Sequence, residues 1–505
     1  MSDRNIPKFQ EEYSAKLPAL ALLTNLGWSF LSPEQALAAR GGKADEVVLR
    51  QVLRSQLEKR TFVFAGKSHS LSEKAIDNLV AEVCSPALNE GLLIANERLY
   101  NHMLYGISVT EFVDGKKASP TIALIDWQTP SNNSFVFTEE FTVTRTGGVE
   151  SRRPDIVCFV NGIPLVVIEA KRPDGYSGLG AQKGPTIDEG ISQCLRNQRH
   201  DEIPILFAYS QLLLSINGNE GRYGTCGTPA KFWAAWREED ISDAEMAAIK
   251  NQALSDDQVT GLFSHRPAKD LDWYQHWTAA GELAITGQDS LLISLLSRAR
   301  LLEMIRYFTL FDKKAGKIVA RYQQAFGIKR LIERINTRST MGGREGGVIW
   351  HTTGSGKSFT MVFLSKALIL HDSLKQCRIV VVTDRVDLET QLSKTFTSGG
   401  ELAAKKDKEA AMATSGKRLA EQIGKGTERI IFSLIQKFNT ATKMPECVNT
   451  SADIIVLIDE GHRSQGGENH IRMKQALPNA AFVAFTGTPL LKSGSSVLAA
   501  LCIAG

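Results

Sequence analysis

The stretch VIWHTTGSGKS, residues 348–358, decides the fold of the second half of the chain. It places a Gly-rich turn between an apolar run and a helical pattern that begins at Lys357, which is the context that a phosphate-binding loop requires. Glycines let successive backbone N–H groups and the helix N-terminus face a phosphate. Lys357 can bring a positive charge to the β- and γ-phosphates, and Ser358 can ligate Mg²⁺. The stretch therefore predicts a nucleotide site, with a chance Gly-rich turn as the alternative.

A second motif, VLIDEGHRSQ at residues 456–465, follows downstream. Its apolar run delivers Asp459 and Glu460 to the carboxyl end of a strand, where α/β sheets place their ligands. Asp459 would hold Mg²⁺ and Glu460 would polarise the attacking water. Because an acidic pair that ends a strand is otherwise typical of a helix cap or a solvated turn, this interpretation depends on the phosphate loop.

Around these motifs, β-rich runs alternate with helical patterns from about residue 301 onward. The runs consist largely of Val, Ile and Leu, and they are GGVIWH, CRIVVVTD, RIIFSLI, DIIVLIDE and AAFVAFTG. Such strands, each followed by a crossover helix, indicate a parallel sheet that is buried on both faces. We therefore expect a doubly wound α/β domain over residues 301–505.

The first half of the chain has a different pattern. Up to about residue 95, apolar residues recur at three-to-four spacing, which indicates amphipathic helices. Short β-rich runs then follow between Gly, Pro, Asn and Asp residues, namely ISVTEFV, TIALIDW, FVFTEEFTVTR, DIVCFV, PLVVIEA and IPILFAYS. They predict one mixed sheet over residues 107–208, with a helix near 187–196. We assign residues 1–260 to this first domain and 261–300 to a linker or helical junction.

The segment RRPDIVCFVNGIPLVVIEAKRP, residues 152–173, carries the chemistry of the first half. An Asn-Gly turn would pair its two strands, so that Asp155 and Glu169 can meet at one edge of the sheet. Glu169 and Lys171 share a face, because side chains alternate along a strand. The two carboxylates can then hold Mg²⁺ at a scissile phosphate, while Lys171 positions or deprotonates the attacking water. The segment therefore predicts metal-assisted hydrolysis of a phosphodiester.

An ordinary hairpin with charged edges is the alternative for this segment. The run VVIEAK argues against it, because a buried strand rarely ends in opposite charges without a partner or a metal. The arrangement resembles the P-D…(D/E)-x-K nucleases. Their subclass in recombination helicases shows Q-x-x-x-Y, which implies a catalytic role for Gln193, whereas Asn197 replaces the Tyr and receives no role. Glu97 could add an upstream carboxylate, with a solvated helical Glu as the alternative.

The second half resembles the superfamily 2 helicases and translocases. The matching segments are RYQ, TGSGKS, IVVVTDRVDLETQL, DEGH and FTGTP, with His351 in place of the first loop Gly and Gly461 in place of the usual Ala. The resemblance implies that ATP and Mg²⁺ bind at Gln323, Thr353, Gly354, Ser355, Gly356, Lys357, Ser358 and Asp459, with Gln323 reading adenine. It assigns coupling between nucleotide and DNA to His462, Thr486, Gly487 and Thr488.

Together, the halves resemble the restriction subunit of type I restriction–modification enzymes. The resemblance implies a restriction-endonuclease-like domain followed by a RecA-like domain. It also implies ATP-driven movement along double-stranded DNA, Mg²⁺-dependent cleavage, and partnership with methyltransferase and sequence-recognition subunits, to which S-adenosylmethionine would belong. A non-catalytic docking subunit and a strand-separating helicase–nuclease are the alternatives.

Superfamily 2 motors need a second RecA-like domain with an arginine finger. Because the sequence stops at Gly505, soon after FTGTP, we expect an N-terminal fragment that binds nucleotide weakly and does not translocate alone.

The composition sets limits on these interpretations. With 43% hydrophobic and 23% charged residues, the chain of 505 residues is typical of globular proteins, which excludes disordered and collagen-like classes. The formal net charge is only +4, so any nucleic-acid surface must be local. Seven cysteines without a C-x-x-C pair suggest neither a disulfide framework nor a zinc knuckle. The absence of a signal peptide and of a long apolar run predicts a cytoplasmic protein without a membrane partner.

Overall fold

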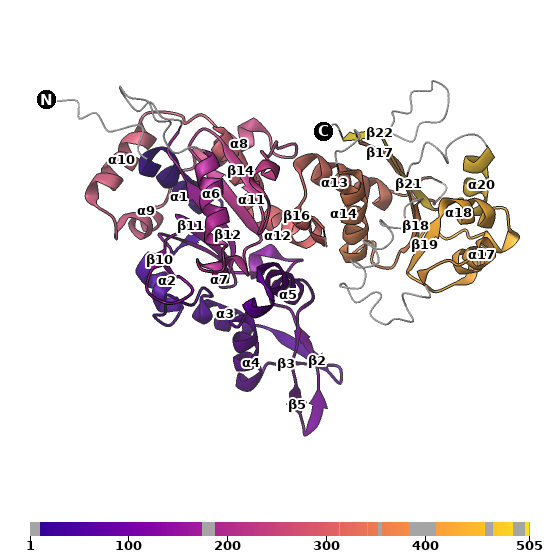
Figure 1. Ribbon diagram of the computed structural model, residues 1–505, viewed down its shortest axis with the longest axis horizontal. Coiled ribbons are helices and arrows are strands. Elements are labelled where there is room, and N and C mark those ends of the chain that lie inside the picture. The colour runs from indigo at the N-terminus through magenta and orange to yellow at the C-terminus, as the bar shows by residue number, and fades with distance from the viewer. Residues whose placement is uncertain are drawn as a thin grey trace. The chain divides into compact units, whose positions relative to one another are not determined.

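The computed structural model divides the chain into two compact units, one of residues 1–306 with 311–319 and one of residues 307–310 with 320–505 (Figure 1). The structure describes residues 11–173, 187–312, 314–340, 342–351, 356–383, 411–459, 468–487 and 500–503. Residues 261–300, expected to be a junction, lie within the first unit.

The first unit is built on a six-stranded sheet of order β1-β8-β11-β12-β13-β14. Its strands are β1 (Ser29–Phe30), β8 (Phe135–Glu139), β11 (Ile156–Val160), β12 (Ile163–Ala170), β13 (Leu212–Ile216) and β14 (Gly221–Gly224). The pairs β1–β8 and β12–β13 are parallel and the other pairs are antiparallel, so the predicted mixed sheet is confirmed. Every residue of β11 and β12 is buried, as their apolar sequences predict.

Three details of this unit differ from the prediction. The run IPILFAYS forms the short helix α7 (Pro204–Phe207) instead of a strand, because Pro204 suits the first helical turn, and the strand β13 follows it. The runs ISVTEFV and TIALIDW lie outside the main sheet, in the small pairs β4 (Ile107–Ser108) with β7 (Thr121–Ile122) and β5 (Glu111–Val113) with β6 (Lys116–Ala118). The N-terminal block also contains β1 and the hairpin β2 (Thr61–Phe64) with β3 (Lys67–Ser70).

Helices surround the mixed sheet (Figure 1). Helix α6 (Ile187–Asn197) packs against β12 and β13 and confirms the helix expected near residues 187–196. Gly190 permits this close approach, since a Cβ there would lie 2.3 Å from Ser215 Oγ. The other helices of the unit are α1 (Leu17–Asn25), α2 (Pro33–Ala39), α3 (Arg50–Leu57), α4 (Glu73–Val83), α5 (Leu92–Tyr105), α8 (Asp243–Lys250), α9 (Asp256–Phe263), α10 (Ala268–Ala279), α11 (Gly287–Leu296) and α12 (Arg298–Tyr307), whose last residue belongs to the second unit.

The second unit contains a six-stranded sheet, of order β19-β18-β20-β21-β17-β22, in which every pair of neighbouring strands is parallel. Its strands are β17 (Gly347–His351), β18 (Arg378–Thr383), β19 (Ile430–Leu434), β20 (Ile454–Ile458), β21 (Ala481–Thr486) and β22 (Ala500–Ile503). The predicted parallel sheet is therefore confirmed, and β22 adds a strand that the sequence pattern did not indicate.

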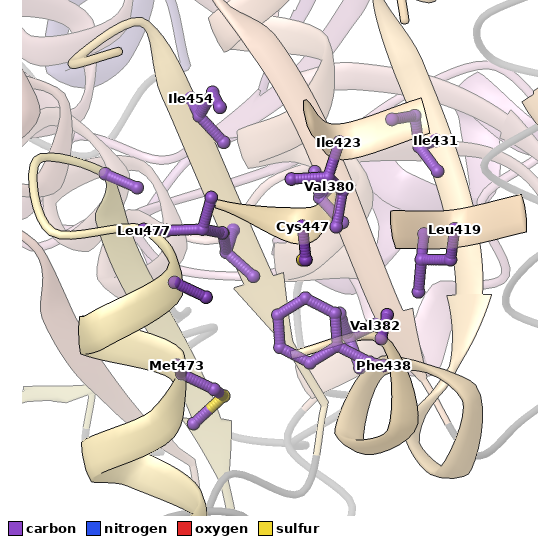
Figure 2. Packing of buried hydrophobic residues seen from close by; sticks show 14 of the residues in the cluster. Val380, Val382, Leu419, Ile423, Ile431, Phe438, Cys447, Ile454, Met473 and Leu477 are labelled. Carbon is purple, nitrogen blue, oxygen red and sulfur yellow. The ribbon is translucent and has the colours of Figure 1, made fainter. Parts of the chain in front are cut away.

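Helices lie on both sides of the parallel sheet (Figure 1). One side carries α13 (Tyr322–Asn336) and α14 (Lys357–Leu370), and the other carries α17 (Gly416–Lys425), α18 (Ile435–Ala441) and α20 (Glu468–Ala476). Figure 2 shows the core between the sheet and the second set, where Phe438 packs among Val382 and other buried apolar side chains. This doubly wound arrangement agrees with the prediction. No helix among the described residues has the length and apolar character of a membrane span.

The strand β16 (Gly316–Val319), which pairs with β15 (Thr309–Asp312), carries a buried lysine, Lys317, that is hydrogen-bonded within the first unit. The ammonium of Lys317 donates hydrogen bonds to Asn96 Oδ1 at 2.8 Å, Gln211 Oε1 at 2.6 Å and the carbonyl of Ser210 at 3.1 Å. These three acceptors are uncharged. Burial lowers the pKa of Lys317 to about 7.

The shift predicts a dependence of stability on pH. An unfolded lysine has a pKa of about 10.4, so between about pH 7 and pH 10 the unfolded chain binds a proton that the folded chain lacks, and stability should rise with pH. We expect Lys317→Met to reduce the slope of the unfolding free energy by about 1.4 kcal/mol per pH unit in this window. Urea unfolding at several pH values measures it, with Lys314→Met on the same hairpin as control. Equal slopes for Lys317→Met and the unaltered protein would refute the shift.

Candidate active sites

The turn between β11 and β12 determines which residues meet at the edge of the mixed sheet. Asn161 and Gly162 adopt φ angles of 51° and 81°, as a two-residue hairpin turn requires. A bulge leaves Leu165 without a partner in β11, so the ladder shifts by one residue and pairs Ile156 with Ile168. Asp155 and Glu169 are the next positions of this ladder. Without the bulge, Asp155 and Glu169 would lie on opposite faces of the sheet, because a shift of one residue moves each side chain of a strand to the other face.

Asp155, Glu169 and Lys171 come together as the sequence predicts. The backbone N–H of Ala170 donates to Asp155 Oδ2 at 2.8 Å and orients this carboxylate. Lys171 Nζ lies 3.6 Å from Asp155 Oδ2 and 3.9 Å from Glu169 Oε2. Pairing with β13 continues through Lys171, whose N–H donates to the carbonyl of Ile216 at 2.7 Å.

The carboxylate of Glu169 is buried without the hydrogen bonds that such a group usually has. Its side chain is 0% exposed, and neither oxygen accepts a hydrogen bond from any residue that the structure describes. Burial raises the pKa of Glu169 well above its ordinary value, and the nearby Asp155 raises it further. Since a buried carboxylate without donors is costly, this position is suited to a bound cation.

Lys171 is surrounded by carboxylates. Burial alone would lower its pKa, but the charges of Asp155, Glu169 and Glu11 outweigh burial and raise it. The ammonium also donates to the carbonyl of Ala170 at 2.8 Å. In this arrangement Lys171 carries a proton at neutral pH, which favours positioning of water or phosphate over abstraction of a proton.

Glu11 is a third carboxylate at this site that sequence reasoning missed. Its Oε2 lies 3.9 Å from Lys171 Nζ, and burial raises its pKa. Glu97, the upstream carboxylate considered from the sequence, is half-buried on α5, a helix that packs against α7. The segment around Glu11 has no motif, so only the folded structure identifies it.

Helix α6 carries Gln193 near the same site. A Cβ at Gly190, one turn earlier, would lie 3.5 Å from the Cβ of Glu169, so this part of the helix covers the carboxylate. Gln193 is half-buried. Asn197, one turn later, is buried, and its Oδ1 accepts no hydrogen bond within the described chain.

The donor set fits Mg²⁺, which needs only one or two carboxylates from the protein. Among the residues that the structure describes, no three His, Cys, Asp or Glu side chains converge to hold a metal by themselves. Mg²⁺ usually keeps several waters and takes one or two carboxylates together with substrate phosphates. Asp155 and Glu169 supply two such carboxylates, one of them with unbonded oxygens.

The two nucleotide motifs of the second unit also meet. Gly356 has a φ of 91°, which favours glycine, and it precedes α14. Lys357 Nζ lies 3.1 Å from Oδ1 of Asp459, which directly follows β20, and Ser358 is half-buried in the first turn of α14. Four predicted site residues, Thr353, Gly354, Ser355 and Glu460, and two coupling residues, His462 and Thr488, lie outside the described part of the chain.

The contact between α13 and the start of α14 is made by Gln324. Its Nε2 donates to Thr360 Oγ1 at 2.9 Å and to the carbonyl of Gly356 at 3.4 Å. Gln323, chosen from the sequence, is half-buried beside it. Because the two glutamines are adjacent, the RYQ pattern alone could not show which of them contacts this turn.

The motif FTGTP begins at the end of β21, a strand of the same sheet. Thr486 ends β21 and is buried, and the carbonyl of Gly487 accepts a hydrogen bond from Trp350 Nε1 at 3.4 Å. The contact connects the end of β21 to β17, the strand that precedes the expected phosphate loop.

Comparison with known proteins places both units in described families. Residues 8–232 match the model of the type I restriction enzyme R protein N terminus, and residues 323–500 match the SWI2/SNF2 ATPase model. The type I restriction enzyme HindI endonuclease subunit of Haemophilus influenzae is 30% identical over 93% of this chain and 42% of its own length. The putative MjaIXP endonuclease subunit of Methanocaldococcus jannaschii is 28% identical over 96% of this chain and 43% of its own.

The chain thus spans less than half the length of these relatives. Among solved structures, the Pyrococcus furiosus Hef helicase domain is 18% identical over 30% of this chain and 31% of its own, with a TM-score of 0.22, too low to support an argument. The two matched models and the endonuclease-subunit relatives agree with the two sheets and their motifs. The chain therefore carries a domain of the type I restriction enzyme R protein N-terminal family over residues 8–232, followed by a SWI2/SNF2 ATPase domain over residues 323–500.

Proposed function

We propose that this chain provides the DNA-cleaving site and part of the ATP-driven motor of a type I restriction endonuclease. The observation that carries the nuclease proposal is Glu169, a buried carboxylate that lacks hydrogen bonds and lies beside Asp155 and Lys171. Its substrate would be double-stranded DNA, in a cytoplasmic complex with methyltransferase and sequence-recognition subunits. The names of the relatives support this assignment.

At the nuclease site, Asp155 and Glu169 would hold Mg²⁺, while Glu11 lies beside Lys171, 3.9 Å from its Nζ. The metal supplies charge to the scissile phosphate and acidifies a bound water. Asp155 is oriented by the backbone of Ala170, and Glu169 is held away from water. Lys171 would keep its proton and donate hydrogen bonds to the attacking water or to a phosphate oxygen. Gln193 would position the same water or phosphate from α6.

At the nucleotide site, Lys357 would contact the β- and γ-phosphates, while Ser358 and Asp459 hold Mg²⁺. In the structure Lys357 forms an ion pair with Asp459. When nucleotide and metal bind, the phosphates would become the partner of Lys357 and the metal that of Asp459. Glu460 would polarise the attacking water, and Thr353, Gly354, Ser355 and Gly356 would donate backbone N–H groups. Gln323 stays the proposed reader of adenine, whereas Gln324 supports the start of α14.

Thermal unfolding with and without Mg²⁺ tests the metal site. In EDTA, Glu169→Gln should unfold at a higher temperature than the unaltered protein, because the buried Glu169 must either stay charged without donors or take up a proton on folding, and Gln does neither; the effect is about 1–3 kcal/mol. Mg²⁺ should stabilise the unaltered protein and leave the variant unchanged, since a ligand stabilises only the fold that binds it. Glu97→Gln is the control and should behave like the unaltered protein. Equal responses of both variants to Mg²⁺ would contradict the proposed site.

A further inference from the structure

Two β-hairpins of the first unit have the same type of turn and similar exposed side chains. Neither hairpin contributes a residue to the nuclease or nucleotide site. Residues 65–66 and 114–115 are their two-residue turns, with φ angles of 50° and 78° in the first and 50° and 75° in the second. In each hairpin one large apolar side chain is exposed on the strand before the turn, Val63 at 76% and Phe112 at 69%. Lys67 and Lys116 each follow a turn directly.

The two hairpins are joined at their bases. Ser72, which follows β3, donates its backbone N–H to Oε1 of Glu111 in β5 at 2.8 Å. Glu111 is 5% exposed and so adds little to the surface charge. Figure 1 shows β2, β3 and β5 at one end of the first unit, away from its six-stranded sheet. We call residues 59–70 and 111–118 the hairpin pair.

The charge of the hairpin pair is strongly positive for a chain with little net charge. Its exposed cations are Lys59, Lys67, Lys116 and Lys117, its exposed carboxylate is Asp114, and the exposed Glu58 directly precedes it; Arg60 is half-buried, with its Nε and Nη2 atoms shielded from solvent. The whole chain carries only +4, so this is a local excess. In the ladder, Phe112 lies opposite Lys117, which places an exposed ring beside a cation.

We propose that the hairpin pair binds duplex DNA, with the lysines on backbone phosphates and Phe112 and Val63 in a groove. A two-stranded ribbon fits the major groove, where an apolar side chain such as Phe can contact the methyl group of thymine. The complementarity of charge favours DNA as the partner, because duplex DNA presents a dense and regular row of negative phosphates to a cationic surface. The inference rests on the proposed function, because DNA is the substrate there.

The salt dependence of DNA binding tests the proposal. The full chain is titrated onto a fluorescein-labelled duplex in EDTA, which prevents cleavage. The triple variant Lys67→Gln, Lys116→Gln, Lys117→Gln should reduce the slope of log K against log [salt] by about 2–3, since each lost phosphate contact removes about 0.9. A matched triple at Lys231, Lys269 and Lys314, exposed lysines elsewhere in the first unit, should leave the slope unchanged.

A second variant separates apolar from ionic contact. Phe112→Ala should weaken binding about 10-fold or more at every salt concentration, as expected for losing a buried aromatic side chain, with the slope unaltered. Thermal midpoints should stay the same for all variants, because the replaced side chains lie on the surface.

Three outcomes would overturn the inference in distinguishable ways. Equal slopes for the two triple variants would remove the hairpin pair from the DNA interface and leave the proposed function intact, and loss of a protein partner with unchanged DNA binding would assign the surface to that partner. Failure of the unaltered chain to bind duplex DNA at any salt concentration would reject the inference together with the proposed function.

Discussion

Replacing Lys171 by Met is expected to lower the rate of DNA cleavage by about 10²–10³-fold, the usual effect of removing one fixed donor from the developing charge of a transition state. The Lys171 side chain is 7% exposed, and its Nζ lies within 4 Å of three carboxylates. Met fills similar apolar space, so the variant removes the charge while keeping the packing. Cleavage of a supercoiled plasmid by the complex that contains the variant measures the effect.

Two further variants make this prediction specific to the site. Lys231→Met, at an exposed lysine of the same unit, should cleave normally. Asp155→Asn should lose as much activity as Lys171→Met or more, because it removes a metal-binding carboxylate. Cleavage at the unaltered rate by both Lys171→Met and Asp155→Asn would exclude this cluster as the nuclease site.

Replacing Lys357 by Ala is expected to weaken the binding of Mg²⁺–ATP by about 10–100-fold, because a hydrogen bond to a charged group contributes about 1.5–3 kcal/mol. The ammonium lies 3.1 Å from Asp459 Oδ1 at the carboxyl end of the parallel sheet, where the phosphates of a nucleotide would lie. Titration with a fluorescent ATP analogue measures the affinity. Lys375→Ala, at an exposed lysine beyond α14, is the control.

The two sites lie in different units, so a substitution at one site should leave ligand binding at the other site unchanged. Lys357→Ala should keep the stabilisation by Mg²⁺ that depends on Glu169, and Lys171→Met should keep its affinity for nucleotide. If Lys357→Ala bound nucleotide as tightly as the unaltered chain, the phosphate loop would have been assigned wrongly.

The sequence predicted those features that short-range rules control. The Asn161–Gly162 turn follows from the preference of two-residue hairpins for positive φ, and the parallel strands follow from runs of β-branched residues between helices. The bulge at Leu165 was beyond such rules, although it decides that Glu169 faces Asp155.

Other features depend on tertiary contacts that no local pattern reveals. Glu11 reaches Lys171 across the fold. The choice between Gln323 and Gln324 depends on which face of α13 meets α14. The apolar run at residues 203–210 is compatible with either a strand or a helix. In the structure Pro204 begins the helix α7, and the strand β13 follows it.

The most direct test of the nuclease assignment is a crystal of this chain soaked in Mn²⁺ and measured for anomalous scattering. The account predicts a peak about 2.1 Å from a carboxylate oxygen of Asp155 and of Glu169, the distance typical of small divalent cations with oxygen ligands. In crystals of Asp155→Asn the peak should disappear. A map without a peak between Asp155 and Glu169, in crystals where Mn²⁺ occupies the nucleotide site, would contradict the account.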